Sequence, residues 1–363
     1  MDKFILSGEE QAVFALRSLY KKYGYAQYKM SKFEEYDLYA KNKDFLVSDN
    51  VITFTDTDGK LLALKPDVTL SIIKNDKDNH DSIKKVFYNE HVYRVSKGTK
   101  SFKEIMQIGL ECVGAVDDYS VIEVLYLASQ SLKEISKESV LDISHLGLVK
   151  SVLDYAGLTE SAKEKVALSL SQKNLQAVQS VAKEQGLDEK KTSLLEKLVT
   201  TYGKAEKVEK ELGAFCVSGE IEEQVKSLKV VIESLKTLDA IDNVNVDFSV
   251  VSDMNYYNGV VFKGFVSGIP TSILSGGQYD NLMQKMGKKS KAIGFAVYLD
   301  EIDRLYENKG QFNVDVAVKY EGASVDAVNK VVKEQIAKGK TVFAGKVLPE
   351  TLKYKELVVL EGK

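Results

Sequence analysis

Apolar residues recur with the period of an α-helix along the first 24 residues of the chain. Ser7 followed by Glu10 matches the capping box that begins helices, because each side chain can pair with the other residue's backbone N–H. Gly24 is placed to end the helix, since glycine adopts the left-handed conformation without strain. The pattern therefore predicts an amphipathic helix. Its apolar stripe consists of Ala12, Leu16, Leu19 and Tyr23.

The pattern then changes to the alternation of β-strands. Residues 51–56 and 60–64 flank Asp58-Gly59, a dipeptide typical of tight hairpin turns. Two further strands are predicted at 85–94 and 104–113.

The strand at 104–113 carries an unusual polar face. Gln107, Gly109 and Glu111 point to one side, and apolar residues point to the other. Because Gly109 has no side chain, we expect an open polar surface on which a small ligand lies against the backbone. Alternation of this kind is also typical of a half-exposed strand without any ligand.

Helical periodicity returns twice in the rest of the chain. One apolar face consists of Val121, Val124, Leu125, Ala128, Leu132 and Ile135. Residues 148–238 contain no proline and are rich in Lys, Glu, Ser, Leu and Ala, which favours a separate helical domain inserted into the sheet protein. Strands are predicted again at 244–250 and 259–262, and a small final unit at 314–318 (strand), 324–337 (helix), 341–343 and 357–360 (strands).

These patterns predict an α+β fold in four segments. They are a first part of the core (1–147), a helical insertion (148–240), a second part of the core (241–310) and a small C-terminal α/β unit (311–363).

Composition narrows the class of protein. With 44% hydrophobic and 28% charged residues, the chain has the make-up of a soluble globular protein, with no run long enough for a membrane span and no secretory signal. A net charge of −3 argues against holding a large polyanion such as tRNA. Two distant cysteines and three unclustered histidines indicate a reducing, cytoplasmic location and no metal site or cofactor.

Four short motifs in a fixed order carry the candidate chemistry. They lie at 64–69, at 92–94 running on to 107–111, at 255–259, and at 276–280 followed by 292–296. In this order and spacing they resemble the class II core of histidyl-tRNA synthetase, over roughly the first 310 residues. The resemblance implies an antiparallel sheet with flanking helices, a pocket for histidine and ATP, and a homodimer built by the segment around Gly24-Tyr25.

The resemblance also implies a set of histidine-binding residues. In the family these positions contact the amino group, the carboxylate and the imidazole of the amino acid. A zwitterion needs an acceptor for its ammonium, donors for its carboxylate and a partner for its imidazole, and the set supplies one of each. The residues at these positions are Asp67, Thr69, Arg94, Gln107, Glu111, Tyr256 and Tyr257.

Each of these residues also has a plainer interpretation. Asp67 follows Pro66, and its role could be limited to capping the helix that begins there. Tyr256 and Tyr257 could simply pack in the core, and Gln107 and Glu111 could be surface residues of a strand. Only the joint pattern favours a binding site.

The nucleotide side of the motifs departs from the family. The whole chain contains only three arginines, and arginine is the bidentate phosphate ligand that lysine does not replace. Ser96 stands where the family has an acid, the loop at 97–103 lacks the expected arginines, and Ser252 and Glu301 occupy two positions at which the family has arginine. Arg304 lies about one helical turn after Glu301 and could compensate in part.

A pocket that binds histidine without activating it resembles a paralogue of the synthetase. This paralogue is the regulatory subunit of ATP phosphoribosyltransferase, which pairs with a short catalytic subunit at the first step of histidine biosynthesis. The resemblance implies a non-catalytic chain that activates this partner, transmits feedback inhibition by histidine, and forms a homodimer within a hetero-oligomer. The alternatives are a divergent histidyl-tRNA synthetase and a stand-alone amino-acid-binding protein.

Overall fold

A computed structural model describes most of the chain: residues 6–43, 46, 50–78, 80–95, 101–251, 256–300, 302 and 312–362. It divides into two compact units, Met1–Ile302 and Asp303–Lys363. Within these described ranges, no helix has both the length and the apolar character needed to cross a membrane.

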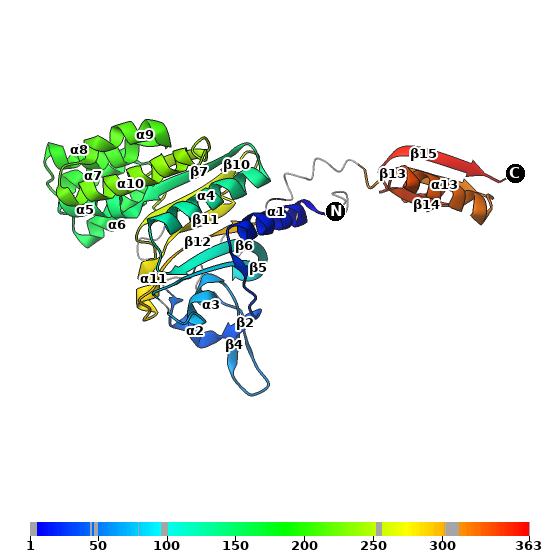
Figure 1. The fold of residues 1–363 in the computed structure, drawn as a ribbon, viewed down its shortest axis with the longest axis horizontal. Coiled ribbons are helices and arrows are strands. Elements are labelled where there is room, and N and C mark those ends of the chain that lie inside the picture. Colours follow the sequence, from blue (N-terminus) through cyan, green and yellow to red (C-terminus); the bar gives the residue numbers. More distant parts are fainter. Residues whose placement is uncertain are drawn as a thin grey trace. The chain divides into compact units, whose positions relative to one another are not determined.

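A nine-stranded sheet runs through the first unit, in the order β1-β5-β6-β12-β11-β10-β7-β9-β8 (Figure 1). All neighbouring pairs are antiparallel except β1 with β5 and β7 with β9. The predicted antiparallel sheet is therefore confirmed, with two parallel pairs added. Its strands are β1 (Ala26–Gln27), β5 (Ile83–Val95), β6 (Phe102–Gly114), β7 (Ser139–His145), β8 (Tyr202–Lys204), β9 (Val244–Asp247), β10 (Val260–Val266), β11 (Leu274–Gln278) and β12 (Lys291–Tyr298).

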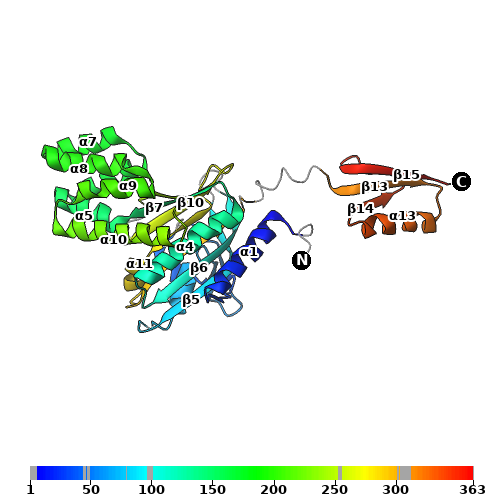
Figure 2. The same ribbon diagram turned by 45° about the horizontal axis from the view of Figure 1, so that its top comes forward.

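Two amphipathic helices, α1 (Gly8–Lys22) and α4 (Asp118–Ile135), cover one face of this sheet (Figure 2). The predicted capping box is present, since Ser7 and Glu10 each accept a hydrogen bond from the other's backbone N–H. Gly24 has a φ of 81°, which confirms its helix-ending role. All six predicted apolar residues of α4 are buried.

The opposite face carries a smaller layer formed by α2 (Tyr36–Ala40), α3 (Thr69–Lys74), α11 (Asp280–Lys285) and a three-stranded sheet. That sheet has the order β2-β4-β3, with β2 at Phe33–Glu35, β3 at Thr53–Thr55 and β4 at Leu61–Leu64. The predicted hairpin is confirmed as β3 and β4, and Gly59 has a φ of 86° in its turn. The observed strands are shorter than the alternation predicts.

A layer of helices follows β7, as the composition and helical periodicity of the sequence predict. One short strand within it, β8, pairs with β9 and so belongs to the central sheet. The division into two units keeps this layer with the sheet, and its status as a separate domain with boundaries at 148 and 240 stays a prediction. The helices are α5 (Leu146–Ala156), α6 (Glu160–Ser171), α7 (Leu175–Glu184), α8 (Glu189–Thr200), α9 (Ala205–Glu211), a 3₁₀ turn η2 (Leu212–Phe215) and α10 (Gly219–Thr237).

The second unit is a small α/β fold, as predicted. Its three strands are all parallel, in the order β14-β13-β15, and Ser324 caps its helix by accepting from the N–H of Ala327. The elements are β13 (Val314–Glu321), α13 (Val325–Ala337), β14 (Val342–Gly345) and β15 (Tyr354–Glu361).

Candidate functional site

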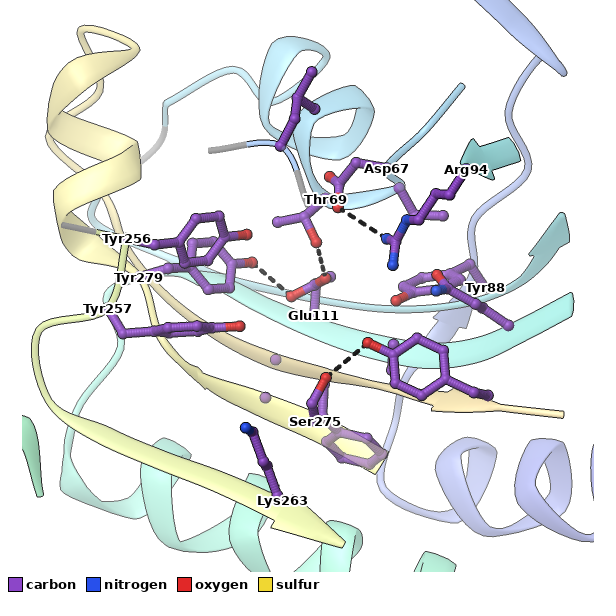
Figure 3. Close-up of a pocket in the computed structure, with 18 residues that line it drawn as sticks. Asp67, Thr69, Tyr88, Arg94, Glu111, Tyr256, Tyr257, Lys263, Ser275 and Tyr279 are labelled. Carbon is purple, nitrogen blue, oxygen red and sulfur yellow. Dashed lines mark hydrogen bonds and ion pairs between the residues drawn. The ribbon is translucent and has the colours of Figure 1, made fainter. Parts of the chain in front are cut away.

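A cavity of about 540 Å³ lies on the face of the central sheet that α1 and α4 leave uncovered (Figure 3). Its floor includes the small residues Gly276, Gly294 and Ala296 of β11 and β12. A Cβ on Gly276 would overlap the carbonyl oxygen of Gly294, and a Cβ on Gly294 would overlap the Glu111 carboxylate. The floor therefore needs glycine at these two positions.

All seven residues that the sequence predicts for histidine binding line this cavity. They come from the start of α3 and the residues just before it, from β5 and β6, and from the segment before β10. The sheet thus brings together positions up to 190 residues apart, calculated from Asp67 to Tyr257. Their role in binding stays a prediction.

Glu111 is the most constrained acid of the cavity. It is 2% exposed, and its carboxylate accepts hydrogen bonds from the Thr69 hydroxyl (2.8 Å) and the Tyr279 hydroxyl (2.6 Å). Burial raises its pKa to about 8, although both hydrogen bonds lower the pKa and the charge of Asp67 adds to the rise. Near neutral pH this side chain can therefore hold or release a proton.

Asp67 lies beside Thr69 and faces Arg94. Its Oδ1 accepts from the N–H of Leu70 at 2.8 Å, and its Oδ2 lies 3.8 Å from Arg94 Nη2. Burial raises the pKa of Asp67, against the opposing effect of the Arg94 charge. Arg94 is also fixed by its Nε, which donates to the carbonyl of Pro66 at 2.7 Å. Asp67 therefore bonds to the first turn of α3, as the plainer interpretation has it, and it also lines the cavity.

Gln107 has a buried hydrogen-bond donor that is available to a ligand. It is 2% exposed, and its Nε2 has no hydrogen-bond partner among the described residues. A buried amide N–H without a partner costs about 1–3 kcal/mol, which a bound acceptor would recover. The alternative that Gln107 and Glu111 are surface residues is wrong, because both are buried.

An aromatic wall closes the cavity on the side of Glu111. The ring centroids of Tyr256 and Tyr257 lie 4.5 Å apart, and those of Tyr256 and Tyr279 lie 6.0 Å apart. Figure 3 shows the three hydroxyls directed into the cavity. Burial raises the pKa of each phenol, so the hydroxyls stay protonated and able to donate. The rings also pack against buried core residues, which confirms the packing interpretation, and the role of Tyr256 and Tyr257 in binding stays a prediction.

The expectation of an open surface over Gly109 is wrong. A Cβ there would overlap the Phe295 carbonyl and the Tyr88 hydroxyl, so the Tyr88 ring fills the space in which we expected a ligand. Gly109 does not line the cavity, whereas Gly276 and Gly294 do. Alternation within one strand could not show this, because Tyr88 belongs to the neighbouring strand β5.

Five lining residues with polar side chains escaped the sequence prediction: Tyr88, Lys263, Ser275, Tyr279 and Tyr298. Tyr279 belongs to the motif at 276–280, which made it a possible candidate. Lys263 interrupts an otherwise apolar strand, and a charge in such a place calls for an explanation. The other three carry no local signal.

Several residues of the nucleotide side lie outside the described part of the structure. They are Ser96, the loop residues 97–100, Ser252, Glu301 and Arg304. Within the described part, no group of three or more His, Cys, Asp or Glu residues could hold a metal ion.

Comparison with known proteins places this geometry in a family. The family model for histidyl-tRNA synthetase matches residues 7–302. A curated relative from Clostridium kluyveri named ATP phosphoribosyltransferase regulatory subunit is 29% identical over 305 residues, covering 82% of this chain and 78% of the relative. A relative of the same name from Bacillus cereus is 26% identical and covers 86% and 76%.

Solved structures show the same fold. A Bacillus halodurans protein described as an ATP phosphoribosyltransferase regulatory subunit/histidyl-tRNA synthetase matches with a TM-score of 0.77 at 21% identity, covering 98% of this chain and 94% of that one. A chain of the ATP phosphoribosyl transferase (HisG:HisZ) complex from Thermotoga maritima matches with a TM-score of 0.64 at 20% identity, covering 80% and 97%. The predicted class II synthetase-like fold is thereby confirmed. Since the family model spans most of its length, the chain belongs to the histidyl-tRNA synthetase family.

Proposed function

We propose that this chain is a non-catalytic regulatory subunit of ATP phosphoribosyltransferase. Its curated relatives carry the name of this subunit. One observation carries the proposal. The chain keeps a buried pocket with the polar groups that an amino acid requires, while Ser252 and Glu301 stand where a synthetase has arginines for ATP. Glu301 is negatively charged like the triphosphate, so this substitution disfavours adenylation more than a neutral residue would.

The geometry supports free histidine as the ligand of the pocket. Asp67 supplies an acceptor for the ammonium group, the unpartnered Nε2 of Gln107 supplies a donor, and Glu111 with the neighbouring phenols faces the imidazole. Glu111 has a pKa of about 8, so an imidazole ring and this carboxyl can share one proton near neutral pH. Histidine would then shift the assembly toward a less active state through its differential affinity, with a coupling of roughly 1–3 kcal/mol.

The partner is a short catalytic subunit of ATP phosphoribosyltransferase. The HisG:HisZ complex from Thermotoga maritima, which contains a chain of this fold, supports a mixed assembly. Homodimerisation around Gly24-Tyr25 rests on the family resemblance. Cys112 and Cys216 are both free, in agreement with the cytoplasmic location of the proposal. We expect no tRNA binding, in view of the net charge of −3.

Two assays test the proposal together. In the first, the chain is mixed with a short catalytic subunit and the formation of phosphoribosyl-ATP is measured with and without L-histidine. We expect a gain in rate on adding the chain and a loss of that gain with histidine. In the second, histidine-dependent ATP–pyrophosphate exchange is measured on the chain alone, and we expect none.

Exchange activity would instead establish a divergent synthetase, for which the retained Arg94 at the pocket is the best structural argument. Histidine binding with neither exchange nor activation would leave a stand-alone amino-acid-binding protein. Either result would contradict the regulatory role.

A further inference from the structure

Lys263 is a cation that the proposed mechanism does not yet use. It lies in the middle of β10, half-buried, and Figure 3 shows its amine directed into the cavity near Tyr257 and Ser275. No hydrogen bond or ion pair joins its ammonium to any residue in the described part of the chain. A lysine held in a pocket without a carboxylate beside it is suited to an anion that arrives with the ligand.

The register of the sheet fixes where this cation stands relative to Glu111. Lys263 pairs with Ser275 across β10 and β11, and Ser275 pairs with Ala296 on β12. Glu111 of β6 pairs with Gly294, two residues before Ala296. Lys263 and Glu111 therefore rise from strands three steps apart, about 14 Å between backbones at the usual spacing. Between them lie mainly glycine, alanine and serine, so the space above the floor is open to a ligand.

The other cation of the cavity is already engaged. Arg94 donates through Nε to the Pro66 carbonyl, and its Nη2 lies 3.8 Å from Asp67. A ligand carboxylate would compete with Asp67 for Arg94, whereas at Lys263 it would meet an ammonium without such a competitor in the described residues. Ser275 and Tyr298, which hydrogen-bond each other at 2.8 Å, add two hydroxyls close to that position.

We infer that Lys263 binds the carboxylate of the amino acid, with the hydrogen-bonded pair of Ser275 and Tyr298 offering a neighbouring hydroxyl donor. This inference rests on the proposed histidine ligand and makes the pocket specific for the free acid. Histidinol keeps the ammonium and the imidazole and replaces the carboxylate by a neutral alcohol. Lys263 therefore becomes the residue that distinguishes histidine from its alcohol.

The test is a calorimetric titration of two ligands against four proteins. L-histidine and L-histidinol are titrated into the unaltered chain, Lys263→Met, Lys263→Arg and the control Lys291→Met, which removes an exposed lysine at the start of β12. Loss of a charge-assisted hydrogen bond predicts that Lys263→Met weakens histidine binding roughly 10- to 100-fold and histidinol binding less than about 2-fold. Lys263→Arg should recover part of the histidine affinity, and Lys291→Met should change neither ligand.

Three results would overturn the inference. Equal weakening of both ligands by Lys263→Met would make Lys263 a structural residue, and no weakening of either would remove it from recognition. If inorganic phosphate competed for binding only when Lys263 is present, and if histidinol bound as strongly as histidine, Lys263 would be a phosphate-binding residue. A failure of the unaltered chain to bind either ligand would contradict the proposed histidine pocket itself, and is distinguishable from the other outcomes.

Discussion

The two ends of the cavity are built on opposite principles. At the acid end, Glu111 is fully enclosed and receives hydrogen bonds from Thr69 and Tyr279 before any ligand is present. At the cation end, Lys263 is half-buried and has no partner among the described residues. The acid end is thus stabilised by the fold, whereas the cation end depends on what binds there.

The difference shows how one pocket can serve both folding and recognition. A buried carboxylate without hydrogen bonds would destabilise the protein, so its partners must be supplied by the chain. A lysine near solvent keeps part of its hydration and tolerates the absence of a partner. We therefore expect substitutions at the acid end to change stability and binding together, and substitutions at the cation end to change binding alone.

The largest effect should come from Gly294→Ala, which places a methyl group against the Glu111 carboxylate and 2.5 Å from the backbone oxygen of Leu110. Neither neighbour can move freely, so we expect a loss of about 1–3 kcal/mol in the free energy of unfolding and no detectable histidine binding. Urea denaturation and calorimetry measure the two effects. Gly213→Ala is the control, because a Cβ there meets nothing within 4 Å.

Glu111→Gln should remove a pH dependence that only the acid end can produce. The free acid has an ordinary pKa of 4.5, and Glu111 in the folded protein has a pKa of about 8. Between these values the folded chain holds a proton that the unfolded chain has lost, so the free energy of unfolding falls as pH rises from 4.5 to about 8. The Gln variant should lose this slope, measured by urea denaturation at several pH values.

The same variant tests the proton shared with histidine. Binding should be strongest between about pH 6.5, where the free imidazole loses its proton, and about pH 8, where Glu111 loses its own. With glutamine, affinity at pH 7 should fall roughly 10- to 100-fold, and the part of the alkaline decline due to Glu111 should vanish. An unchanged pH profile in the Gln variant would show that Glu111 does not contact the imidazole.

Tyr279→Phe should have an intermediate effect. It removes the hydroxyl that donates to Glu111 at 2.6 Å and leaves that carboxylate with one side-chain donor fewer. We expect a loss of about 1 kcal/mol in the free energy of unfolding and a further rise in the Glu111 pKa. Tyr298→Phe is the matched change at the cation end. It should lower the free energy of unfolding by less, because Ser275 and Tyr298 are both only partly buried. Equal losses would erase the contrast between the ends.

The smallest effect should be that of Lys263→Met on stability without ligand. Since no described residue pairs with its ammonium, we expect the free energy of unfolding to change by less than about 0.5 kcal/mol. Urea denaturation without and then with histidine is the measurement. A loss above about 1 kcal/mol without histidine would mean that Lys263 serves the fold.

Much of the fold could be predicted because its signals are local. The capping box at Ser7 and Glu10, the glycine at 24 and the Asp58-Gly59 turn each act within a few residues, and all three are observed. The helix α4 follows from simple periodicity. The parallel pairing of β7 with β9 was not predicted, because it joins strands separated by the whole helical layer.

The candidate site was predicted where its residues fall inside motifs. Asp67, Gln107 and Glu111 line the cavity together, as the motif order implied. Lys263 and the role of Gly109 could not be derived, because both depend on which strands become neighbours. Gly109 accommodates the ring of Tyr88 from β5, and Lys263 faces the cavity only because β10 lies beyond β11 and β12.

The floor of glycine and alanine leaves the spacing of the sheet to set the length of the pocket. The separation between the strand of Glu111 and that of Lys263 is set by backbone hydrogen bonds, whose spacing hardly varies from one sheet to another. Side chains on the walls can therefore drift during evolution without altering the length that the pocket measures. A lineage that loses an enzyme's chemistry can in this way keep a pocket whose length still matches the enzyme's substrate.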